Sequence, residues 1–355
     1  MDKQDILSLL PHELQALMVR LGEPAYRAEQ IFAWLHRGKR FAEMTNLPLA
    51  LREKLEDCCE LRLPVVQSKQ VSADGTVKYL FALIDGACVE SVLMRYKHGH
   101  SLCISSQVGC RMGCRFCAST IGGKERDLRA SEMLGQVIAA VADSGERVDS
   151  IVMMGIGEPL DNYDNTVRFL HLVNHPAGLQ IGYRHISLST CGLSDGILRL
   201  AEEGLPITLS VSLHAATDQA RSALMPVNRT HPLSRLLSAC AAYFDKTGRR
   251  ISFEYTLLSG VNDRDEDAYA LAKLLKGHLG ERAPLHVNLI RLNEVAERPL
   301  RSSPDSRAAR FAARLEQCGV RATLRRRLGT DIDAACGQLR RRQAGASPDG
   351  QPPEA

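Results

Sequence analysis

The sequence predicts an α/β protein whose main part is a parallel sheet curved into a partial barrel. From residue 101 onward, stretches with the apolar pattern of buried strands are followed six times by stretches with helical periodicity. Six strand–helix units in succession are typical of a parallel sheet, and in sequence order they favour a barrel. At 355 residues and 45% hydrophobic composition, the chain is long enough to bury such a core.

Two smaller segments precede the strand–helix units. Residues 1–62 predict an N-terminal helical module, because apolar residues recur at helical spacing through residues 11–22 and 25–38. Residues 63–98 change to a period of two, which predicts a small antiparallel β extension. Its strands are expected at residues 65–71, 77–84 and 87–94, separated by the hairpin signals Ala73-Asp74-Gly75 and Asp85-Gly86.

We expect the barrel core to occupy residues 99–328. Its strands are predicted at residues 101–106, 150–154, 185–190, 207–213, 252–258 and 286–290, with a last strand at 321–325. The helices that follow the six strands are predicted at residues 131–144, 162–173, 195–203, 233–247, 266–279 and 305–318. Residues 329–343 form a C-terminal segment. Residues 344–355 are expected to be disordered because they are rich in Pro, Gly, Ala and acidic groups.

The chain is mildly basic. Its 45 Lys and Arg against 41 Asp and Glu give a net charge of +4, with an isoelectric point near 8.5. This value falls short of about 9, above which a dedicated nucleic-acid-binding domain typically lies. Arginines nevertheless gather at residues 321–327 and 340–342, and a smaller basic group lies at residues 37–40. A solvated arginine face and contact with RNA phosphates are both open on this evidence.

No targeting or membrane segment is predicted. The polar start Met1-Asp2-Lys3-Gln4-Asp5 argues against a secretory signal peptide, and no stretch approaches about 18 uninterrupted apolar residues. Eleven cysteines in such a chain indicate reduced thiols, metal ligands or catalytic groups in the cytoplasm rather than a disulfide framework.

Three cysteines with the spacing C-x3-C-x2-C form the most informative group: Cys110, Cys114 and Cys117. A closed structural zinc site takes four ligands, so these three would need a distant cysteine or histidine. Three thiolates can instead hold three irons of a 4Fe–4S cluster and leave the fourth iron open to another ligand. The spacing, with Phe116 before the last cysteine, resembles the signature of the radical S-adenosylmethionine (SAM) enzymes. In those enzymes the open iron binds SAM, which is cleaved to a 5′-deoxyadenosyl radical.

Polar residues follow the predicted strands at one rim of the sheet. Four such loops beside the cysteine loop favour the radical SAM interpretation over zinc, because parallel α/β folds bind ligands at this rim. A motif like Gly157-Glu158 holds the SAM amino group in radical SAM enzymes, and glycine there lets a ligand approach the backbone. The four loops contain Gly155-Ile156-Gly157-Glu158-Pro159, Ser187-Leu188-Ser189-Thr190, Ser210-Val211-Ser212-Leu213-His214, and Asn288 with Asn293.

Three motifs in order resemble the RlmN/Cfr family of radical SAM RNA methyltransferases, and the resemblance covers nearly the whole chain. They are Cys103-Ile104-Ser105-Ser106-Gln107-Val108-Gly109-Cys110, Gly157-Glu158-Pro159-Leu160 and Asp331-Ile332-Asp333-Ala334-Ala335-Cys336-Gly337-Gln338. The resemblance implies a radical SAM partial (β/α)6 barrel in which residues 329–343 are a catalytic segment. It also implies 4Fe–4S ligands at Cys110, Cys114 and Cys117, and SAM contacts at Gly157, Glu158, Ser189, Ser212, Leu213, His214 and Asn293.

The resemblance assigns roles to three other residues. Cys336 would accept a methyl group from one SAM, since a thiolate is a strong nucleophile whereas the target adenine carbon is electrophilic. A second SAM would supply the radical that takes a hydrogen from this methyl group before its carbon adds to the adenine. Glu90 would accept the proton from the modified carbon, and Cys103 would release the product through a transient disulfide with Cys336. Without the resemblance, both cysteines would be ordinary buried thiols and Glu90 an exposed strand carboxylate.

Members of the family differ in the adenine carbon that they methylate. RlmN-type enzymes act at carbon 2 of an adenine in the peptidyl-transferase region of 23S rRNA, and some at the tRNA adenine beside the anticodon. Cfr-type enzymes act at carbon 8 of the same rRNA adenine and confer antibiotic resistance. Pro159 follows the RlmN pattern, whereas Arg291 and Met94-Arg95-Tyr96-Lys97 lean towards the Cfr side. On these signals we favour carbon 2.

The expected partners are 23S rRNA, tRNA and an electron donor such as flavodoxin or ferredoxin, with the enzyme acting as a monomer in the cytoplasm. The N-terminal helices and C-terminal arginines would contact folded RNA through its phosphates and shape. The adenine would have to leave its stack to reach a buried cluster. Two hypotheses of other kinds stay open: a non-enzymatic Fe–S RNA-binding protein, and a radical SAM enzyme that acts on a protein or a small molecule.

Overall fold

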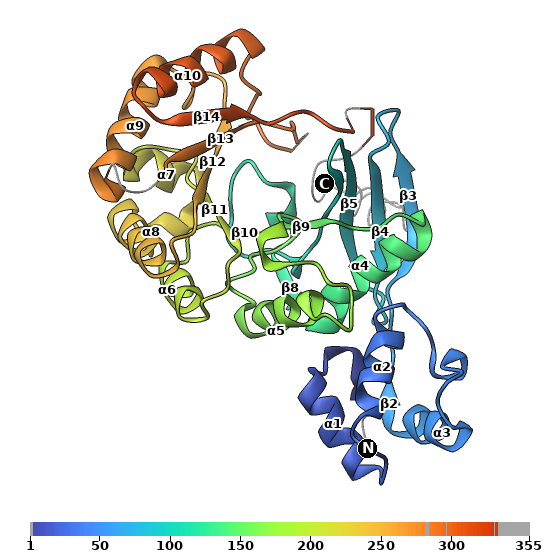
Figure 1. Ribbon diagram of the computed structural model, residues 1–355. Helices are drawn as coiled ribbons and strands as arrows, with labels where there is room; N and C mark the ends of the chain where they lie inside the picture. The colour runs from blue at the N-terminus through green and yellow to red at the C-terminus, as the bar shows by residue number, and fades with distance from the viewer. Residues whose placement is uncertain (1–2, 281–283, 296, 330, 333–355) are drawn as a thin grey trace.

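The computed structural model describes residues 3–280, 284–295, 297–329 and 331–332. Cys336 and the tail expected at residues 344–355 lie outside these ranges, as does most of the segment expected at residues 329–343. Within the described part, a curved sheet carries helices along its outside, and a small helical module lies at one end (Figure 1).

The sheet has ten strands in the order β14-β13-β12-β11-β10-β9-β6-β5-β4-β3. Its parallel strands are β6 (Gly99–Cys103), β9 (Ser150–Met153), β10 (Ile186–Thr190), β11 (Thr208–Ser212), β12 (Ile251–Leu257), β13 (His286–Arg291) and β14 (Arg321–Leu324). Each of these strands pairs with the next parallel strand along the chain, which is barrel order and differs from the reversed order of doubly wound sheets. Because β14 and β3 lie at opposite ends of the described sheet, the barrel is partial.

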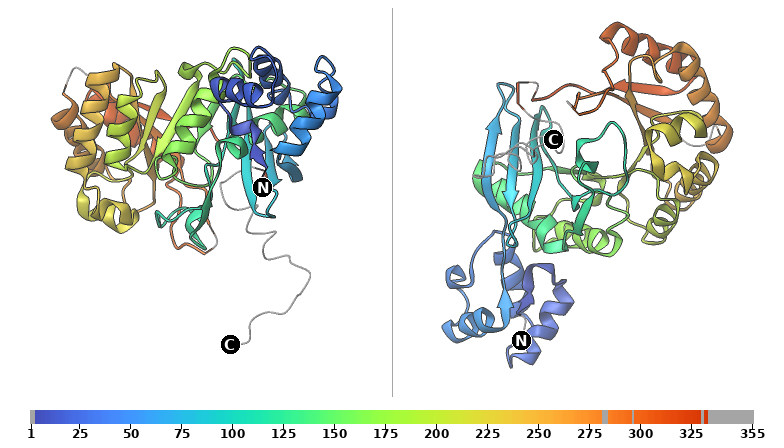
Figure 2. Two further views of the ribbon diagram at one scale, coloured as in Figure 1. Left: turned by 90° about the horizontal axis from the view of Figure 1, so that it is seen from below. Right: turned by 180° about the vertical axis from the view of Figure 1, so that it is seen from behind.

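The helices of the barrel lie on the convex side of the sheet (Figures 1 and 2). They are α4 (Ala130–Ser144), α5 (Tyr163–Asn174), α6 (Ser194–Glu202), α7 (Asp218–Leu224), α8 (Leu233–Thr247), α9 (Asp265–Leu279) and α10 (Asp305–Gln317). Strand β12 shows how the two faces of the sheet differ. Its apolar residues Phe253, Tyr255 and Leu257 are buried, and the Tyr255 ring stacks on Phe311 of α10 at 5.3 Å. The alternate residues of β12 are polar and turn to the inside of the barrel.

Three antiparallel strands extend the same sheet beyond β6. They are β5 (Cys88–Tyr96), β4 (Val77–Ala82) and β3 (Val65–Val71), and β5 pairs directly with β6. The segment expected as a β extension is therefore hydrogen-bonded to the barrel, and its inner face continues the inner face of the parallel strands (Figure 2).

The N-terminal module contains α1 (Pro11–Arg20), α2 (Arg27–Leu35) and α3 (Leu49–Cys58), with β1 (Gln4–Asp5) paired to β2 (Cys59–Glu60). It packs against α4 and α5 of the barrel. The Ser131 hydroxyl at the start of α4 donates to Asp5 Oδ2 at 2.6 Å, and Arg168 of α5 forms an ion pair with Glu13 of α1. Short 3-10 turns complete the chain at Ile6–Ser8, Phe41–Glu43, Ala118–Thr120, Tyr183–His185 and Pro226–Arg229.

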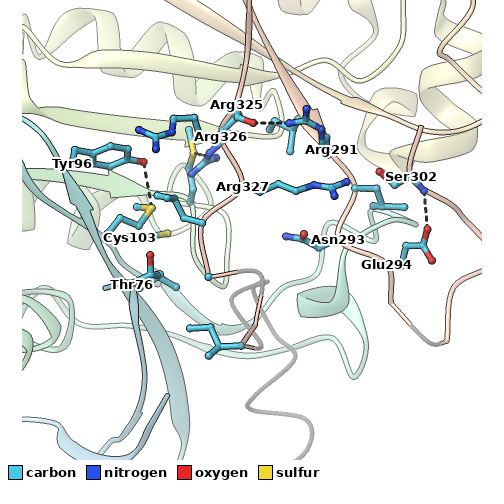
Figure 3. A pocket seen from close by; sticks show the side chains of 18 residues that line it. Thr76, Tyr96, Cys103, Arg291, Asn293, Glu294, Ser302, Arg325, Arg326 and Arg327 are labelled. Carbon is cyan, nitrogen blue, oxygen red and sulfur yellow. Dashed lines mark hydrogen bonds between the residues drawn. The ribbon is translucent and has the colours of Figure 1, made fainter. Parts of the chain in front are cut away.

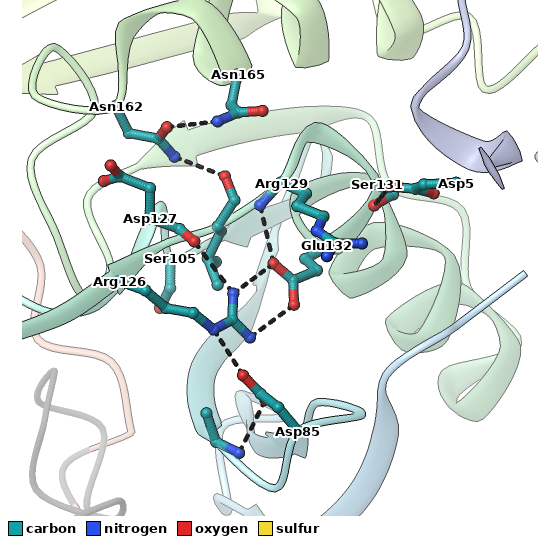
Figure 4. A network of polar contacts seen from close by, with 12 residues as sticks. Asp5, Asp85, Ser105, Arg126, Asp127, Arg129, Ser131, Glu132, Asn162 and Asn165 are labelled. Carbon is teal, nitrogen blue, oxygen red and sulfur yellow. Dashed lines mark hydrogen bonds and ion pairs between the residues drawn. The ribbon is translucent and has the colours of Figure 1, made fainter. Parts of the chain in front are cut away.

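A polar network fixes the hairpin β7 (Gln107–Gly109) and β8 (Lys124–Asp127) to the barrel (Figure 4). Arg126 of β8 donates from both terminal nitrogens to the Glu132 carboxylate of α4 at 2.8 Å, and its Nε lies 2.6 Å from Asp85 Oδ2. Asp85 lies in the turn between β4 and β5. Strand β8, at one end of the cysteine loop, is thereby held against both α4 and the turn between β4 and β5.

The α/β partial barrel expected from the sequence is confirmed. The sequence did not predict α7 or the β7–β8 hairpin. Helix α7 makes about two turns, too few for a periodic pattern to show, and the hairpin strands are three and four residues long. The first parallel strand also ends at Cys103 and not at Ser106, because the chain then turns into the hairpin. Within the described residues, no helix is both long enough and apolar enough to cross a membrane.

Candidate active site

The three clustered cysteines lie in the loop that connects β7 and β8. Cys110 N donates to Gly123 O at 3.0 Å, which closes the base of this loop. Thr120 Oγ1 lies within hydrogen-bond distance of the carbonyl oxygens of Cys114 (3.2 Å) and Cys117 (3.0 Å). The loop backbone is therefore shaped by the protein itself.

The thiols of this loop are shielded from solvent. Cys110 and Cys114 are buried, and Cys117 is half-buried. Burial raises the pKa of Cys110 to about 12, and burial also raises the pKa of Cys114. These two thiols would ionise only with a cation beside them, as bound iron would provide.

Glu158 follows β9 and lies beside the cysteine loop. Its carboxylate is 3% exposed and accepts hydrogen bonds from Cys191 N at 2.6 Å and Leu160 N at 3.1 Å. Burial raises the pKa of Glu158, so a cationic group placed next to it would stabilise its charged form. Gly157 has φ +111°, and a Cβ there would lie 2.6 Å from Gln107 Cβ. This close approach to the hairpin requires glycine.

His214 follows β11 and has a left-handed backbone, with φ +57°. Its Nδ1 accepts a hydrogen bond from Thr256 N at 2.9 Å, and Asn262 Nδ2 donates to its carbonyl at 2.8 Å. Burial lowers the pKa of His214 to about 3, so the ring is neutral and carries its proton on Nε2. The His214 ring also meets Phe116 of the cysteine loop edge-on at 4.6 Å, which joins the two parts of the site.

Most of the residues predicted to hold the cluster and SAM line one cavity of about 280 Å³. Leu213 does not line it. Its side chain is in the core, and its backbone N donates to Glu254 O at 3.0 Å. The predicted residues that do line the cavity are Cys110, Cys114, Cys117, Gly157, Glu158, Ser189, Ser212, His214 and Asn293.

A second cavity of about 550 Å³ adjoins the first (Figure 3). Figure 3 shows Cys103 and Tyr96 on one side of it and Arg291 and Asn293 on the other, with three arginines at residues 325–327 extending between them from the segment after β14. Arg291 Nη1 donates to Arg325 O at 3.2 Å. The two cavities share the lining residues Met154, Ile290, Arg291, Leu292, Asn293 and Arg325, so they lie directly beside each other.

Glu90 lies on β5 but lines neither of these two cavities. The side chain is 2% exposed, so it is not the exposed strand carboxylate that the sequence alone would suggest. Its Oε2 lies 2.9 Å from Lys78 Nζ, and the Lys78 side chain is fully buried. Glu90 shares its strand face with Val92 and Tyr96, which line the larger cavity.

The donor set of the smaller cavity fits an iron–sulfur cluster. Thiolate sulfur is the ligand that such clusters prefer, and the three cysteines of the loop all line the cavity. Among the described residues, no three His, Cys, Asp or Glu side chains gather closely enough to hold one metal ion. A 4Fe–4S cluster places each thiolate on a different iron, so three separated sulfurs are compatible with it. Cys110, Cys114 and Cys117 would hold the cluster.

The structure adds cavity residues that the sequence analysis did not single out. Glu254 and Thr256 of β12 line the smaller cavity, and so does Cys191, whose N–H donates to Glu158. Burial raises the pKa of Glu254, whose Oε2 accepts from Asn288 Nδ2 at 2.7 Å. In the sequence, polar residues alternate with apolar ones along β12. This alternation could have indicated that one face of the strand is polar and turns to the inside of the barrel.

A partial barrel with a three-cysteine loop at the carboxyl ends of its strands defines the class of radical SAM enzymes. In agreement, residues 104–272 match the Radical SAM superfamily, and residues 4–61 match the ribosomal RNA large subunit methyltransferase N-terminal domain. The chain belongs to the RlmN family of radical SAM RNA methyltransferases.

Similar proteins cover nearly the full length of the chain. A protein of Alkaliphilus metalliredigens named "Probable dual-specificity RNA methyltransferase RlmN" is 49% identical over 344 residues, with 96% of each chain covered. A protein of the same name from Symbiobacterium thermophilum is 51% identical and covers 96% of this chain and 92% of its own. The crystal structure of a radical SAM methyltransferase from Sphaerobacter thermophilus superimposes with a TM-score of 0.89. Its sequence is 42% identical, with 94% of this chain and 98% of that chain covered.

Proposed function

We propose that this protein methylates carbon 2 of an adenine in the peptidyl-transferase region of 23S rRNA. We also propose that it acts on the adenine beside the anticodon of some tRNAs, as the dual-specificity name of its relatives suggests. The methyl carbon would pass through an S-methylcysteine at Cys336. The single observation that carries this proposal is the position of Cys103, whose side chain lines the cavity that adjoins the three-cysteine cavity.

The two adjoining cavities suit two different parts of the reaction. When bound at the smaller cavity, the 4Fe–4S cluster and SAM would supply a 5′-deoxyadenosyl radical. Glu158 would accept a hydrogen bond from the amino group of SAM, because a buried carboxylate is stabilised by a cation beside it. Ser189, Ser212 and Asn293 offer hydrogen-bonding groups on the same cavity wall, and the neutral His214 ring offers a donor at Nε2.

The larger cavity suits a nucleotide. Its arginines at residues 325–327 and 291 would attract phosphates, and an adenine extruded from its stack would enter between them and Tyr96. Cys103 would then lie within the same space as the modified base and Cys336, which is where a resolving thiol has to act. Glu90, on the same strand face as two cavity-lining residues, would accept the proton from carbon 2.

Carbon 8 methylation, as in Cfr-type enzymes, is the second candidate function. One observation favours it: Arg291 and Tyr96, the residues that lean towards the Cfr side in sequence, both line the larger cavity. Pro159 of the RlmN pattern and the RlmN names of the relatives favour carbon 2. We further propose that the enzyme works in the cytoplasm as a monomer and receives electrons from a flavodoxin or a ferredoxin.

Single substitutions of the two mechanistic cysteines test this proposal. Cys336→Ala should abolish methyl transfer to RNA, while the visible absorbance of the reconstituted cluster stays at the wild-type level. Cys103→Ala should instead accumulate protein covalently bound to RNA, because the resolving thiol is missing. Cys240→Ala provides the control, since Cys240 is buried in α8 away from both cavities. Normal methylation by Cys336→Ala would contradict the proposed route through S-methylcysteine, whereas a loaded wild type that binds RNA but never methylates it would favour an Fe–S RNA-binding protein.

A further inference from the structure

Arg221 is a buried arginine of α7 that uses its guanidinium to connect backbone segments. The side chain is 0% exposed. The described residues offer it no ion pair within 4.0 Å. Its hydrogen bonds go instead to four carbonyl oxygens and one amide oxygen, which together match the five N–H groups of a guanidinium.

Three of these hydrogen bonds reach the ends of two neighbouring parallel strands. Arg221 Nη2 donates to Cys191 O, after β10, at 2.6 Å, and to Ser212 O, at the end of β11, at 3.0 Å. Its Nε donates to Leu213 O at 3.2 Å. One rigid, planar group thus sets the separation between the loops that follow β10 and β11.

The connection continues to a third strand end. Cys191 accepts from Arg221 through its carbonyl, and its N–H donates to Glu158 Oε2 at 2.6 Å. Glu158 follows β9, so a chain of hydrogen bonds runs from Glu158 through Cys191 and Arg221 to Ser212. Glu158 and Ser212 both line the smaller cavity, whereas the Arg221 side chain does not.

Arg221 also borders the strained backbone at His214. The left-handed conformation of a histidine costs free energy and persists only where the surroundings hold it. Asn262 and Thr256 hold His214 itself, and Arg221 holds the carbonyl of the preceding residue, Leu213. Arg221 Nη1 donates to Asn228 Oδ1 at 2.9 Å and to His231 O at 3.4 Å. These two hydrogen bonds anchor the guanidinium from the opposite side.

A buried cation is a poor way to gain stability. Burial lowers the pKa of Arg221, because keeping a charged group away from water costs free energy. We therefore interpret the guanidinium, which binds carbonyl oxygens of the loops after β10 and β11, as a group that fixes the positions of these loops at the edge of the cavity.

We propose that Arg221 is a positioning residue for SAM: its guanidinium fixes the carboxyl ends of β10 and β11 so that Glu158, Ser212 and His214 meet the ligand together. The inference rests on the proposed SAM site and adds a residue that does not touch the ligand. A lysine cannot replace it, because one ammonium group cannot reach three carbonyls of two loops in a fixed plane.

The test compares Arg221→Lys and Arg221→Met with Arg235→Lys. Arg235 is the matched control, because it is a half-exposed arginine of α8 whose ion pair with Asp195 lies on the surface. Iron content, cluster absorbance and melting temperature report on folding and on the cysteine loop. Equilibrium dialysis with SAM, and the change that SAM causes in the electron paramagnetic resonance spectrum of the reduced cluster, report on the SAM site.

We expect both Arg221 variants to assemble the cluster and to bind SAM about tenfold or more weakly, with the spectral change shifted to correspondingly higher SAM concentration. Arg235→Lys should bind SAM as the wild type does. Wild-type SAM affinity in a folded Arg221→Lys protein would overturn the inference, as would a loss of SAM affinity that only follows a loss of cluster. If Arg221→Met does not fold, Arg221→Lys carries the comparison. A wild-type protein that binds no SAM would refute the proposed function instead.

Discussion

Lys78 Nζ lies 2.9 Å from Glu90 Oε2, across the pair of strands β4 and β5, and neither side chain is more than 2% exposed. The two residues are diagonal neighbours on the inner face of the sheet, since Leu80 is directly opposite Glu90 and Lys78 is opposite Val92. A carboxylate buried away from water needs a partner of opposite charge, and Lys78 supplies one to Glu90. The pair therefore links the fold of the β extension to the role proposed for Glu90.

Replacing Lys78 by methionine should damage both stability and activity. Removing one partner of a buried ion pair costs about 3–5 kcal/mol, because the remaining charge loses its compensation in a dry environment. We expect a clear fall in melting temperature and a loss of methyl transfer in Lys78→Met, with partial retention of both in Lys78→Arg. Lys69→Met is the control, because its pair with Asp143 is solvent-exposed and such pairs contribute about 0–1 kcal/mol. Equal effects of the Lys78 and Lys69 substitutions would show that the buried pair has no special role.

Acid should weaken the packing of the N-terminal module against the barrel. His36 is buried against Phe32 at a ring distance of 4.1 Å, and neither ring nitrogen has a hydrogen-bond partner among the described residues. Burial lowers the pKa of His36 to about 3 from an ordinary value of 6.5. Between these two values the unfolded chain binds a proton that the folded chain does not, so stability falls as pH decreases from 6.5 towards 3.

At pH 5 this histidine should lower the free energy of unfolding by about 2 kcal/mol relative to pH 8. His36→Phe should remove that part of the pH dependence, which chemical denaturation of both proteins at pH 5 and pH 8 would measure. His278→Phe is the control, since His278 is exposed on α9 and should leave the difference unchanged. An unaltered pH dependence in His36→Phe would mean that this ring does become protonated inside the folded protein.

Gly157→Ala should weaken SAM binding by moving the loop that carries Glu158. An alanine Cβ would lie 2.6 Å from Gln107 Cβ and 2.7 Å from Gln107 N, and the left-handed φ of +111° adds backbone strain. Gly277→Ala is a fair control, because no atom lies within 4 Å of its new methyl group and alanine favours a helix. Dialysis with labelled SAM should show a large loss for the first variant and none for the second; equal affinities would contradict the proposed place of Glu158.

Much of this architecture could be predicted from the sequence because it depends on local patterns. The apolar runs of the parallel strands and the helical stripes between them placed six strand–helix units, and the cysteine spacing placed the centre of the site. The joining of β5 to β6 could not be predicted in this way. It depends on pairing between strands, and alternation within each strand contains no information about its neighbour.

The supporting residues of the site were also hidden from sequence reasoning. Arg221 lies in a helix of seven residues, where a charged side chain is ordinarily a solvated surface group. Lys78 and Glu254 look like the polar positions of strands with one exposed face, yet both are buried inside the curve of the sheet. Only the closing of the sheet into a partial barrel turns these faces inward, and that closure is a property of the whole fold.

Mass spectrometry of nucleosides tests the proposed methylation of adenine at carbon 2 most directly. Ribosomal RNA and tRNA from a host that lacks its own family member would be incubated anaerobically with the reconstituted protein, SAM and a reductant, then digested. We expect 2-methyladenosine in both the ribosomal RNA and the tRNA. Formation of 8-methyladenosine would place it among the carbon 8 methyltransferases, and a loaded enzyme that forms no methylated adenosine would contradict the proposed substrate.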